Sequence, residues 1–535
     1  MIQRATPSGF PLRRAGRQPL HRYGSVLWLL CLVWLGLTSC GAAAQPNVLL
    51  IYTDDQGYGD AGCLNPASKI PTPTLDRIAH EGLTFTDAHS SDTVCTPSRY
   101  GLLTGRYSWR TELKRGVFGA ERPCLIADER PTIASLLRSQ GYQTAMVGKW
   151  HLGMDFPGER GNRDWSQPTH DMPLDKGFDY FYGIPASLNY GILAWFEGRF
   201  AAVPPTAFTS KKPNPLAIDD YRIAPPYAAS PKELTPPDAW GNVRGPIEVA
   251  PDFVDAECLT RFTDRAVAWL TESQQPPRRS SPFFLYLAYT SPHKPVIPLQ
   301  RFRGQSTAGA YGDFLMETDW HIGRLLDHLA ELGVADDTLV IVTSDNGPET
   351  TWRKRANRYG HQSNGPYREG KRSVYEGGHR VPFLVRWPAV IPAGSTSATP
   401  ICQTDIFATL ADILGVPLPD TAAEDSVSFH ASLTTPDAPQ MRAPLIHHAA
   451  QGRFAIRSGD WKLVMPHRKA SAELYNLSQD PAETTDLAAA HPEHVARLTD
   501  EITAIVTRGR TRDGLPQPND QPWWDDLTWI PPPAE

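Results

Sequence analysis

Short apolar runs recur along the chain, and each leads directly into polar residues. Residues 47–52 (Asn-Val-Leu-Leu-Ile-Tyr) form such a run, which is followed by a threonine and two aspartates. Three later runs have the same design, at 142–147, 283–290 and 338–343. A continuous apolar run of this length is typical of a strand that is buried on both faces of a sheet. We therefore expect four buried strands.

Helical patterns precede two of these runs. Residues 132–140 show helical periodicity and end before Gly141, and residues 313–332 end before Gly333. Glycine is favoured just beyond a helix C-terminus because it accepts the left-handed conformation there. Helices that alternate with buried strands predict an α/β fold whose sheet is largely parallel.

The pattern changes near the C-terminus. Residues 453–457 and 461–465 flank a Ser-Gly-Asp turn and predict a hairpin, and 473–477 predict a third strand. Residues 492–508 have apolar positions at helical spacing. Together they predict a small α+β subdomain. Residues 513–535, rich in proline and tryptophan, are expected to form an extended tail on the surface.

The N-terminus has the order of an export signal: arginines, an apolar run at 26–37, and small residues. Twelve residues are too few to span a bilayer comfortably. Residues 37–41 (Leu-Thr-Ser-Cys-Gly) resemble a bacterial lipobox, which implies cleavage before Cys40 and lipid attachment to its sulfur. Cleavage before Gln45 is the alternative. We expect a periplasmic or cell-envelope lipoprotein, with a secreted protein as the second possibility.

Composition argues against nucleic-acid binding and leaves the disulfide pattern open. The 535 residues include 52 basic and 58 acidic ones, so the net charge of −6 offers no basic face for nucleic acid. Beyond the signal, the cysteines are too sparse for a disulfide scaffold. They are Cys63, Cys95, Cys124, Cys258 and Cys402. Up to two bridges are possible beside Cys95, and their pairing stays open.

The polar residues after the strands suit a hard metal ion and an anion. Asp54, Asp55, Asp345 and Asn346 offer only oxygen, so they predict Ca²⁺, with Mg²⁺ or Mn²⁺ behind it, and disfavour zinc. Taken alone, either pair could equally be a turn. Positive or proton-donating groups would surround the cation and hold a tetrahedral oxyanion. These are Arg99, Lys149, His151, His293 and Lys371.

Residues 95–99 (Cys-Thr-Pro-Ser-Arg) add a thiol to this set. Pro97 suits the first position of a helix, so Cys95 or Thr96 should lie at a helix N-terminus, which favours negative charge. Arg99 follows one turn later and adds a forked cation. By itself the pentapeptide would be a loop cysteine ahead of an ordinary helix.

Further motifs accompany this signature. They are 46–48 (Pro-Asn-Val), 54–60 (Asp-Asp-Gln-Gly-Tyr-Gly-Asp), 148–153 (Gly-Lys-Trp-His-Leu-Gly), 345–347 (Asp-Asn-Gly), 370–371 (Gly-Lys), 375–378 (Tyr-Glu-Gly-Gly), 474–477 (Leu-Tyr-Asn-Leu) and 480–483 (Asp-Pro-Ala-Glu). Through them, in order and over nearly the whole mature chain, the sequence resembles the formylglycine-dependent sulfatases of the alkaline phosphatase superfamily. Residues 183–187 (Gly-Ile-Pro-Ala-Ser) further resemble the branch that contains arylsulfatase A and the N-acetylgalactosamine-6-sulfatases.

The resemblance implies an alkaline-phosphatase-like α/β fold: a large mixed, mostly parallel sheet sandwiched by helices, with a smaller C-terminal α+β subdomain that carries an antiparallel sheet. We expect a signal peptide at 1–44, a catalytic domain at 45–425, the C-terminal subdomain at 426–512 and the tail at 513–535. Residues 151–252 show few helices or strands and are expected to be loops on the site face.

The resemblance also implies a chemistry. Cys95 would be oxidised to formylglycine (3-oxoalanine) by a maturation enzyme, and its hydrate would attack sulfur while held on Ca²⁺ by Asp54, Asp55, Asp345 and Asn346. Arg99 and Lys149 would orient the hydrate, Lys149 and Lys371 would contact the substrate, and His293 would bind substrate and protonate the departing alcohol. His151 would remove the second hydrate proton, and Ser187 would bind substrate. Lys294 receives no role.

The expected export and an aromatic region favour a sulfated saccharide as the substrate, with arylsulfatase activity as well. Aromatic residues between positions 180 and 196 could stack on a sugar ring or form local core. They are Tyr180, Phe181, Tyr182, Tyr190, Trp195 and Phe196. Two alternatives stay open: a phosphonate or phosphate monoester hydrolase of the same superfamily, and a non-catalytic lipoprotein that binds sulfated glycans.

Overall fold

The four apolar runs form neighbouring parallel strands of one sheet. They are β1 (Asn47–Asp54), β4 (Gln143–Lys149), β13 (Phe283–Pro292) and β14 (Thr338–Ser344). Their order across the sheet is β4-β13-β1-β14, and all three pairings are parallel. The predicted core of the sheet is therefore confirmed, and the polar residues after each strand lie at one edge.

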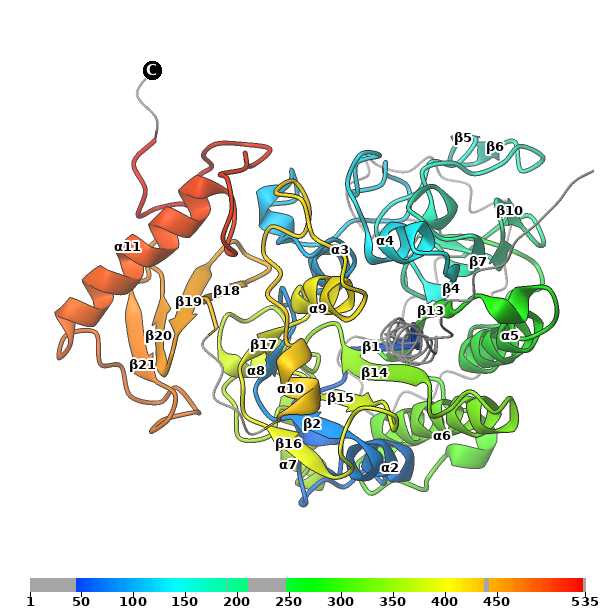
Figure 1. Ribbon diagram of the computed structural model, residues 1–535, viewed down its shortest axis with the longest axis horizontal. Coiled ribbons are helices and arrows are strands. Elements are labelled where there is room, and N and C mark those ends of the chain that lie inside the picture. Colours follow the sequence, from blue (N-terminus) through cyan, green and yellow to red (C-terminus); the bar gives the residue numbers. More distant parts are fainter. Residues whose placement is uncertain (1–44, 190, 210–246, 437–441, 533–535) are drawn as a thin grey trace, which may run out of the picture. The chain divides into compact units, whose positions relative to one another are not determined.

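This computed structural model describes residues 45–189, 191–209, 247–436 and 442–532 (Figure 1). Residues Pro46–Glu535 form one compact unit. The predicted export signal, including the apolar run at 26–37 and Cys40, lies outside the described residues. In the part of the chain that is described, no helix has both the length and the apolar character needed to cross a membrane.

Within the described residues the main sheet has ten strands, in the order β10-β9-β7-β4-β13-β1-β14-β15-β2-β16. Strand β7 (Tyr180–Ile184) is parallel to β4, and β16 (Ser395–Ser397) is parallel to β2 (Leu83–Phe85). Strand β15 (Phe383–Arg386) runs antiparallel to both of its neighbours, as β9 (Phe196–Glu197) does to β7 and β10 (Phe200–Ala201). The sheet is thus mixed and mostly parallel, as predicted.

Helices cover both faces of this sheet. The helices of the unit are α2 (Pro73–Glu81), α3 (Cys95–Thr104), α4 (Ile133–Ser139), α5 (Cys258–Ser273), α6 (Gly309–Glu331), α7 (Trp352–Tyr359), α8 (Glu376–His379), α9 (Asp405–Ile413), α10 (His430–Thr434) and α11 (Pro492–Arg508). Helix α6 contacts both α2 and α5, helices α3, α4 and α9 contact one another, and Figure 1 shows the two groups on opposite sides of the sheet. The expected sandwich is confirmed.

The segment between β4 and α5 differs from the loops expected there. It contributes β7, β9 and β10 to the main sheet and forms a small sheet from β8 (Ile192–Leu193), β11 (Ala207–Thr209) and β12 (Ile247–Val249). Two further short pairs are β5 (Gly158–Glu159) with β6 (Asn162–Arg163), and β3 (Ala88–His89) with β17 (Ile401–Cys402). Strands of two to five residues are too short to show an alternation of apolar and polar positions.

The C-terminal part forms the predicted α+β unit. Strands β18 (Leu445–His448), β19 (Phe454–Ser458), β20 (Trp461–Val464) and β21 (Glu473–Asn476) make an antiparallel sheet. Helix α11 contacts β19 and β20, and its bounds are those predicted. Strand β18 was not expected, because its two histidines interrupt the apolar alternation.

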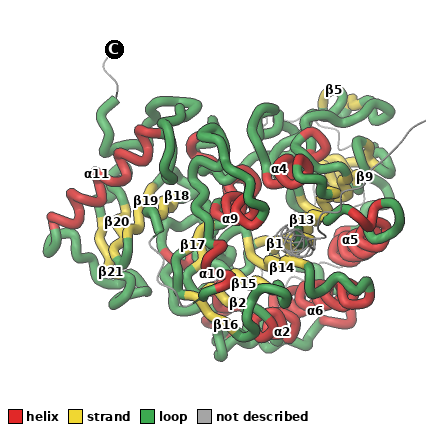
Figure 2. Tube along the Cα trace, viewed as in Figure 1, coloured by secondary structure: helices red, strands yellow, loops and turns green. Residues whose placement is uncertain are grey.

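The tail is more than a surface strap. Its described residues contain no helix or strand (Figure 2). Trp524 and Leu527, however, are only 7% and 1% exposed and pack into the core between α11 and the C-terminal antiparallel sheet. The surface expectation is therefore wrong for these two side chains, because their apolar area is better buried than solvated.

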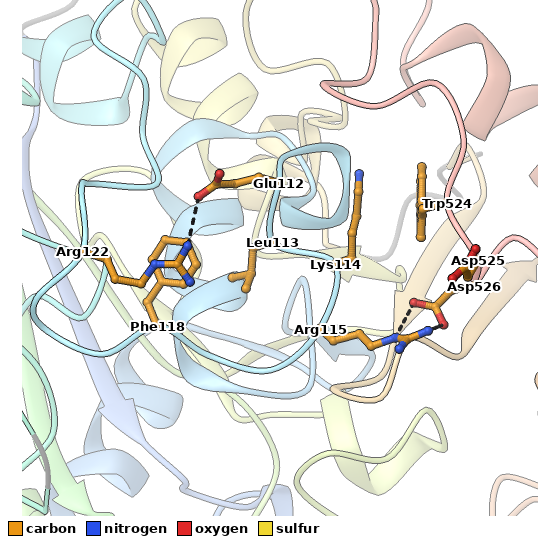
Figure 3. A pocket seen from close by; sticks show the side chains of 9 residues that line it. All are labelled: Glu112, Leu113, Lys114, Arg115, Phe118, Arg122, Trp524, Asp525 and Asp526. Atoms are coloured by element: carbon orange, nitrogen blue, oxygen red, sulfur yellow. Dashed lines mark hydrogen bonds and ion pairs between the residues drawn. The ribbon is translucent and has the colours of Figure 1, made fainter. Parts of the chain in front are cut away.

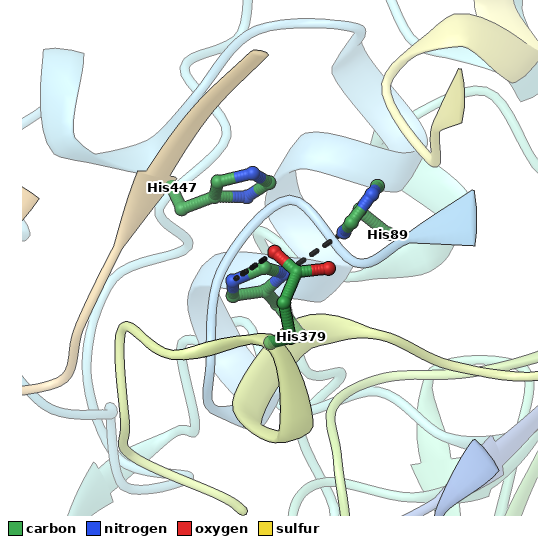
Figure 4. A group of neighbouring side chains, drawn as sticks. His89, His379 and His447 are labelled. Atoms are coloured by element: carbon green, nitrogen blue, oxygen red, sulfur yellow. Dashed lines mark hydrogen bonds and ion pairs between the residues drawn. The ribbon is translucent and has the colours of Figure 1, made fainter. Parts of the chain in front are cut away.

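Three histidines meet where the C-terminal sheet joins the main unit (Figure 4). His89 Nδ1 lies 2.9 Å from His379 Nδ1, and the ring of His447 stacks on that of His379 at 3.7 Å. Lys462 Nζ lies 3.1 Å from His379 Nε2 and 2.9 Å from Glu376 Oε1. All five side chains are buried, so motif residue Glu376 and Lys462 form a polar junction with the histidines.

The buried histidines of this junction should make the folded protein less stable in acid. Burial lowers the pKa of His89 to about 4 and the pKa values of His379 and His447 well below their usual range. The unfolded chain takes up these protons near pH 6.5 and the folded chain does not, so stability falls as the pH drops from about 6.5 to about 4, by about 3 kcal/mol for His89 alone.

Denaturant titrations at pH 7 and pH 4.5 will measure this loss. His447→Phe keeps a stacking ring but cannot titrate, so the variant should lose about 2–3 kcal/mol less than the wild type over that interval. An equal loss in both proteins would show that this histidine does not contribute.

Candidate active site

The two predicted pairs of oxygen ligands meet at the end of the sheet. Asp54 ends β1, and Thr53 pairs with Ser344, the last residue of β14. Beyond these strand ends, the backbone N–H of Asp55 donates to Asp345 Oδ1 at 3.1 Å, and Asn346 Nδ2 donates to Asp55 Oδ1 at 2.8 Å. The four side chains are fully buried. The expectation that they lie together is confirmed.

Two backbone positions at this edge are strained. Asp55 has a φ of 68° and His151 a φ of 61°, in the left-handed region that non-glycine residues rarely adopt. Asp55 directly follows β1 and His151 lies two residues beyond β4, so the chain turns sharply at both strand ends. Strain of this kind persists where the surroundings enforce it, and it is frequent in functional sites.

Helix α3 brings Cys95 to the same place. Cys95 is the first residue of the helix, and Pro97 is its third, two positions later than expected. A proline fits there because the first N–H groups of a helix have no partner within it. Arg99, one turn on, donates to the carbonyl of Lys149 at 2.9 Å and to Asp345 Oδ2 at 3.2 Å.

The thiol lies between a carboxylate and an ammonium group. Cys95 Sγ is 3.5 Å from Asp54 Oδ1 and 3.5 Å from Lys371 Nζ. Lys149 donates to Asp54 Oδ2 at 2.5 Å, and Lys371 donates to a carboxylate oxygen of Asp55. The structure therefore brings together every predicted residue named in this paragraph.

The predicted histidines border the cluster. His293 Nε2 lies 3.8 Å from the second carboxylate oxygen of Asp55, and its Nδ1 lies 2.6 Å from the carbonyl of Lys294. His151 Nε2 lies 2.9 Å from the carbonyl of Phe118. His151 is fully buried and feels the charges of Lys149, Arg99 and Asp54.

Ser187 lies in the loop after β7, beside the chain that carries His151. The backbone N–H of His151 donates to the carbonyl of Pro185 at 2.9 Å. The Ser187 hydroxyl is buried and has no hydrogen-bond partner among the described residues. The hydroxyl is available to bind a substrate, and among the described residues it has no hydrogen bond to the oxygen ligands or to Cys95.

Burial and charge set the protonation of the site. Burial raises the pKa of the Cys95 thiol, so it is a neutral thiol and not a thiolate. Burial alone would raise the pKa of Asp54, yet Lys149, His293 and Arg99 hold it well below its usual range. Burial lowers the pKa of His293 to about 4 and lowers that of His151 well below its usual range. The imidazoles are therefore neutral at pH 7.

The oxygen ligands fit a divalent cation. Asp55 Oδ2 and Asn346 Oδ1 are buried and accept no hydrogen bond from the described residues, although such atoms normally have a partner. Burial and the charge of Asp54 raise the pKa of Asp345, because the carboxylates repel one another. Asp54, Asp55, Cys95 and His293 have ligand atoms within 4.8 Å of one another. A hard, oxygen-preferring cation would relieve both the repulsion and the missing bonds.

Most of the aromatic residues considered for sugar stacking are core residues. Phe181, Tyr182, Trp195 and Phe196 are at most 5% exposed, and Tyr182 stacks on Trp195. Tyr190 lies outside the described residues. The region is thus a hydrophobic support for the site, not an open platform.

A cavity of about 390 Å³ lies beside the loop that carries Phe118 (Figure 3). Four of its charged lining residues are already paired: Arg115 with Asp526, and Arg122 with Glu112 at 3.8 Å. Phe118 lines this cavity and also links to the site, since its N–H donates to the Thr96 hydroxyl at 3.2 Å.

Sequence reasoning missed two charged residues at the edge of the site, Glu349 and Arg372, and gave no role to a third, Lys294. Glu349 forms ion pairs with Arg372 and, at 3.3 Å, with Lys294. Arg372 directly follows Lys371, and Lys294 directly follows His293. That adjacency was the available signal, but no pattern indicated that they share one partner.

Known proteins support this arrangement over most of the chain. Residues 46–416 match the family described as Sulfatase, and residues 368–508 match the family described as N-sulphoglucosamine sulphohydrolase, C-terminal. An N-acetylgalactosamine-6-O-sulfatase from Bacteroides thetaiotaomicron is 32% identical over 88% of this chain and 97% of that protein. Human arylsulfatase A is 33% identical over 87% of this chain and 90% of that protein.

Solved structures agree. One, from work on the metabolism of multiple glycosaminoglycans by Bacteroides thetaiotaomicron, has a TM-score of 0.73 at 31% identity and covers 86% of this chain and 99% of that one. Another, a complex with k-i-k-neocarrahexaose, shares the fold with a TM-score of 0.66 at 24% identity, over 91% of this chain and 96% of that one. The chain therefore belongs to the sulfatase family of the alkaline phosphatase-like superfamily and hydrolyses sulfate esters.

Proposed function

We propose that this sulfatase acts on a sulfated saccharide and uses a formylglycine made from Cys95. The observation that carries the proposal is the setting of the Cys95 thiol, 3.5 Å from both the Asp54 carboxylate and the Lys371 ammonium. A buried neutral thiol is a weak nucleophile, and an oxygen-preferring cation has little use for sulfur. Residue 95 is better placed as the precursor of an oxygen nucleophile.

Two groups would complete the site. Formylglycine at residue 95 would supply an oxygen nucleophile in its hydrated form. Asp54, Asp55, Asp345 and Asn346 would hold a Ca²⁺ ion, which would supply Lewis acidity. The aldehyde also requires a maturation enzyme as a partner.

The chain's own cations position and neutralise charge. Arg99 is fixed by its bonds to the Lys149 carbonyl and Asp345, so its guanidinium cannot swing away from residue 95. Lys149 is held near residue 95 by its hydrogen bond to Asp54. The Lys371 ammonium lies beside residue 95, where it would bind sulfate oxygens as negative charge shifts onto the leaving oxygen.

The two histidines would move protons. His293 Nδ1–H donates to the Lys294 carbonyl, so Nε2 faces the site, and the negative charge of a bound sulfate ester favours its protonated form. It would then protonate the departing alcohol. His151 donates from Nε2 to Phe118, which leaves Nδ1 as the basic nitrogen to take a proton from residue 95.

The saccharide part of the proposal rests on relatives. The N-acetylgalactosamine-6-O-sulfatase and the structure from glycosaminoglycan metabolism both match at over 30% identity. The Ser187 hydroxyl, buried and without a partner among the described residues, is the candidate for a direct substrate contact.

The test is sulfate release after co-expression with a maturation enzyme. We expect hydrolysis of sulfated hexosamines and of aryl sulfates, with matched aryl phosphonates hydrolysed far more slowly. A large preference for phosphonates would favour the alternative hydrolase, and sulfated saccharides all left intact would remove the saccharide proposal. The binding-only alternative is excluded, because the chain is a sulfuric ester hydrolase.

We further propose that residues 1–44 direct export and that Cys40 carries lipid. Metabolic labelling with a fatty acid should mark the wild-type protein and not a Cys40→Ala variant. Label on both proteins, or on neither, would contradict the anchor.

His293→Ala should affect substrates according to their leaving group. A sugar alkoxide needs a proton as it departs, so kcat/KM for a saccharide sulfate should fall about 10²–10⁴-fold. A nitrophenolate is stable without that proton, so nitrophenyl sulfate should lose far less. His80→Ala, at an exposed position on α2, is the control. Equal losses on both substrates would show that His293 binds but does not protonate.

A further inference from the structure

Lys294, Glu349 and Arg372 form a charged trio that the proposed mechanism does not use. Arg372 contacts both carboxylate oxygens of Glu349, one of them at 3.0 Å, and Lys294 Nζ lies 3.3 Å from Glu349 Oε2. The acid is 7% exposed, whereas the side chains of Lys294 and Arg372 are 24% and 39% exposed. The trio therefore has a buried negative centre and two accessible positive ends.

The trio is joined covalently to the catalytic groups. Lys294 follows His293, Arg372 follows Lys371, and Glu349 stands three residues beyond Asn346. Arg372 interacts electrostatically with Asp55 and Cys95, and Glu349 with Lys371, so the trio borders the groups proposed to handle the sulfate. The Lys371 N–H donates to the Pro348 carbonyl at 2.9 Å and ties these loops together.

The charge of the trio does not cancel. Two cations face one carboxylate, which leaves an excess of one positive charge at the edge of the site. An ammonium has three donors, and Lys294 directs one at Glu349, so it can bind a ligand without leaving its partner. An anion placed there would meet both cations on a partly exposed surface.

Arg372 has an unfavourable backbone. Its φ of 76° lies in the left-handed region, where a residue with a Cβ costs on the order of 1 kcal/mol and glycine costs little. The Arg372 N–H donates to the Thr93 carbonyl at 2.9 Å, which holds this conformation. A side chain retained at such a position is consistent with a role for the guanidinium.

We propose that Lys294 and Arg372 form a second anion-binding position, which receives a negatively charged group of the substrate other than the sulfate that is removed. A second sulfate and a sugar carboxylate share the required chemistry. The inference rests on the proposed function of the site, and it makes the preferred substrate a saccharide with at least two negative charges.

Four saccharides separate the sources: a neutral sugar with one sulfate, its disulfated form, and two monosulfated disaccharides that differ by a uronate carboxylate. The matured wild type should show kcat/KM at least about tenfold higher for one of the doubly charged forms than for its singly charged partner. The pair that shows the difference identifies the group. Equal values in both pairs would overturn the inference.

The variants act in opposite directions. Lys294→Gln should reduce the preference about tenfold, and Arg372→Gly should reduce it while relieving the backbone. Glu349→Gln should increase it, because both cations lose their competing partner. Lys469→Gln, at an exposed position in the C-terminal subdomain, is the matched control. If the trio is only a structural salt bridge, all three variants will lower the unfolding temperature and leave the preference unchanged.

Calorimetric binding of the same saccharides to Cys95→Ala protein provides a readout without turnover. If Cys95→Ala prefers the doubly charged ligand while the matured wild type hydrolyses no saccharide, the proposed substrate class is rejected and the anion position is kept. Equal affinities would reject the anion position alone.

Discussion

Cys95→Ala will lower kcat for sulfate ester hydrolysis by about 10⁵-fold or more, the scale on which a nucleophile contributes in hydrolases. The variant removes the thiol, without which maturation cannot convert the Cβ of residue 95 to an aldehyde. It leaves the Asp54, Lys149 and Lys371 charges in place. The loss should therefore appear in kcat with both aryl and saccharide sulfates, measured in steady-state assays of co-expressed protein.

Cys258→Ala is the matched control for this result. Cys258 is a buried cysteine at the start of α5, so its replacement creates a similar small void away from the site. It should keep near wild-type kcat, and both variants should unfold cooperatively. Activity of Cys95→Ala within about tenfold of the wild type would mean that residue 95 does not perform the chemistry.

Asp55→Asn will produce the second large loss. The substitution keeps the shape and tolerates the left-handed backbone at this position, where φ is 68°. It removes a negative charge that Lys371 and Asn346 contact and that a cation would need. We expect kcat/KM to fall by about 10³-fold, the range of a lost electrostatic group in a preorganised site.

A second readout separates metal binding from catalysis. Ca²⁺ at about 100 times its Kd should stabilise the wild type by about 2.7 kcal/mol and raise its unfolding temperature. Asp55→Asn should show little stabilisation, and Asp336→Asn, at an exposed site before β14, should behave like the wild type. Equal stabilisation of Asp55→Asn and wild type would exclude Asp55 as a ligand.

The main sheet and the site could be predicted from the sequence because both follow from local order. Each buried strand is a continuous apolar run, and its polar residues follow directly, so parallel pairing alone brings Asp54, Asp55, Asp345 and Asn346 to one edge. The helix of Cys95 was also expected, although it begins two residues earlier than Pro97 suggested.

Other features depend on partners distant in sequence. Strands β7, β9 and β10 are short and gain their register from the sheet, so the segment looked like loops. The junction of His89, His379 and His447 joins three separate segments, so no sequence spacing predicts that these side chains meet. The same holds for the trio around Glu349, whose members lie 55 and 23 positions from it.

The central claim is that residue 95 is converted before it acts, and the mass of one peptide tests it most directly. Trypsin should release residues 78–99 as a single peptide from protein co-expressed with a maturation enzyme. We expect a lower peptide mass, because one oxygen replaces a sulfur and two hydrogens. The fraction of molecules with this lower mass should match the relative kcat of each preparation. Full sulfatase activity from protein whose peptide retains the unmodified thiol would contradict it.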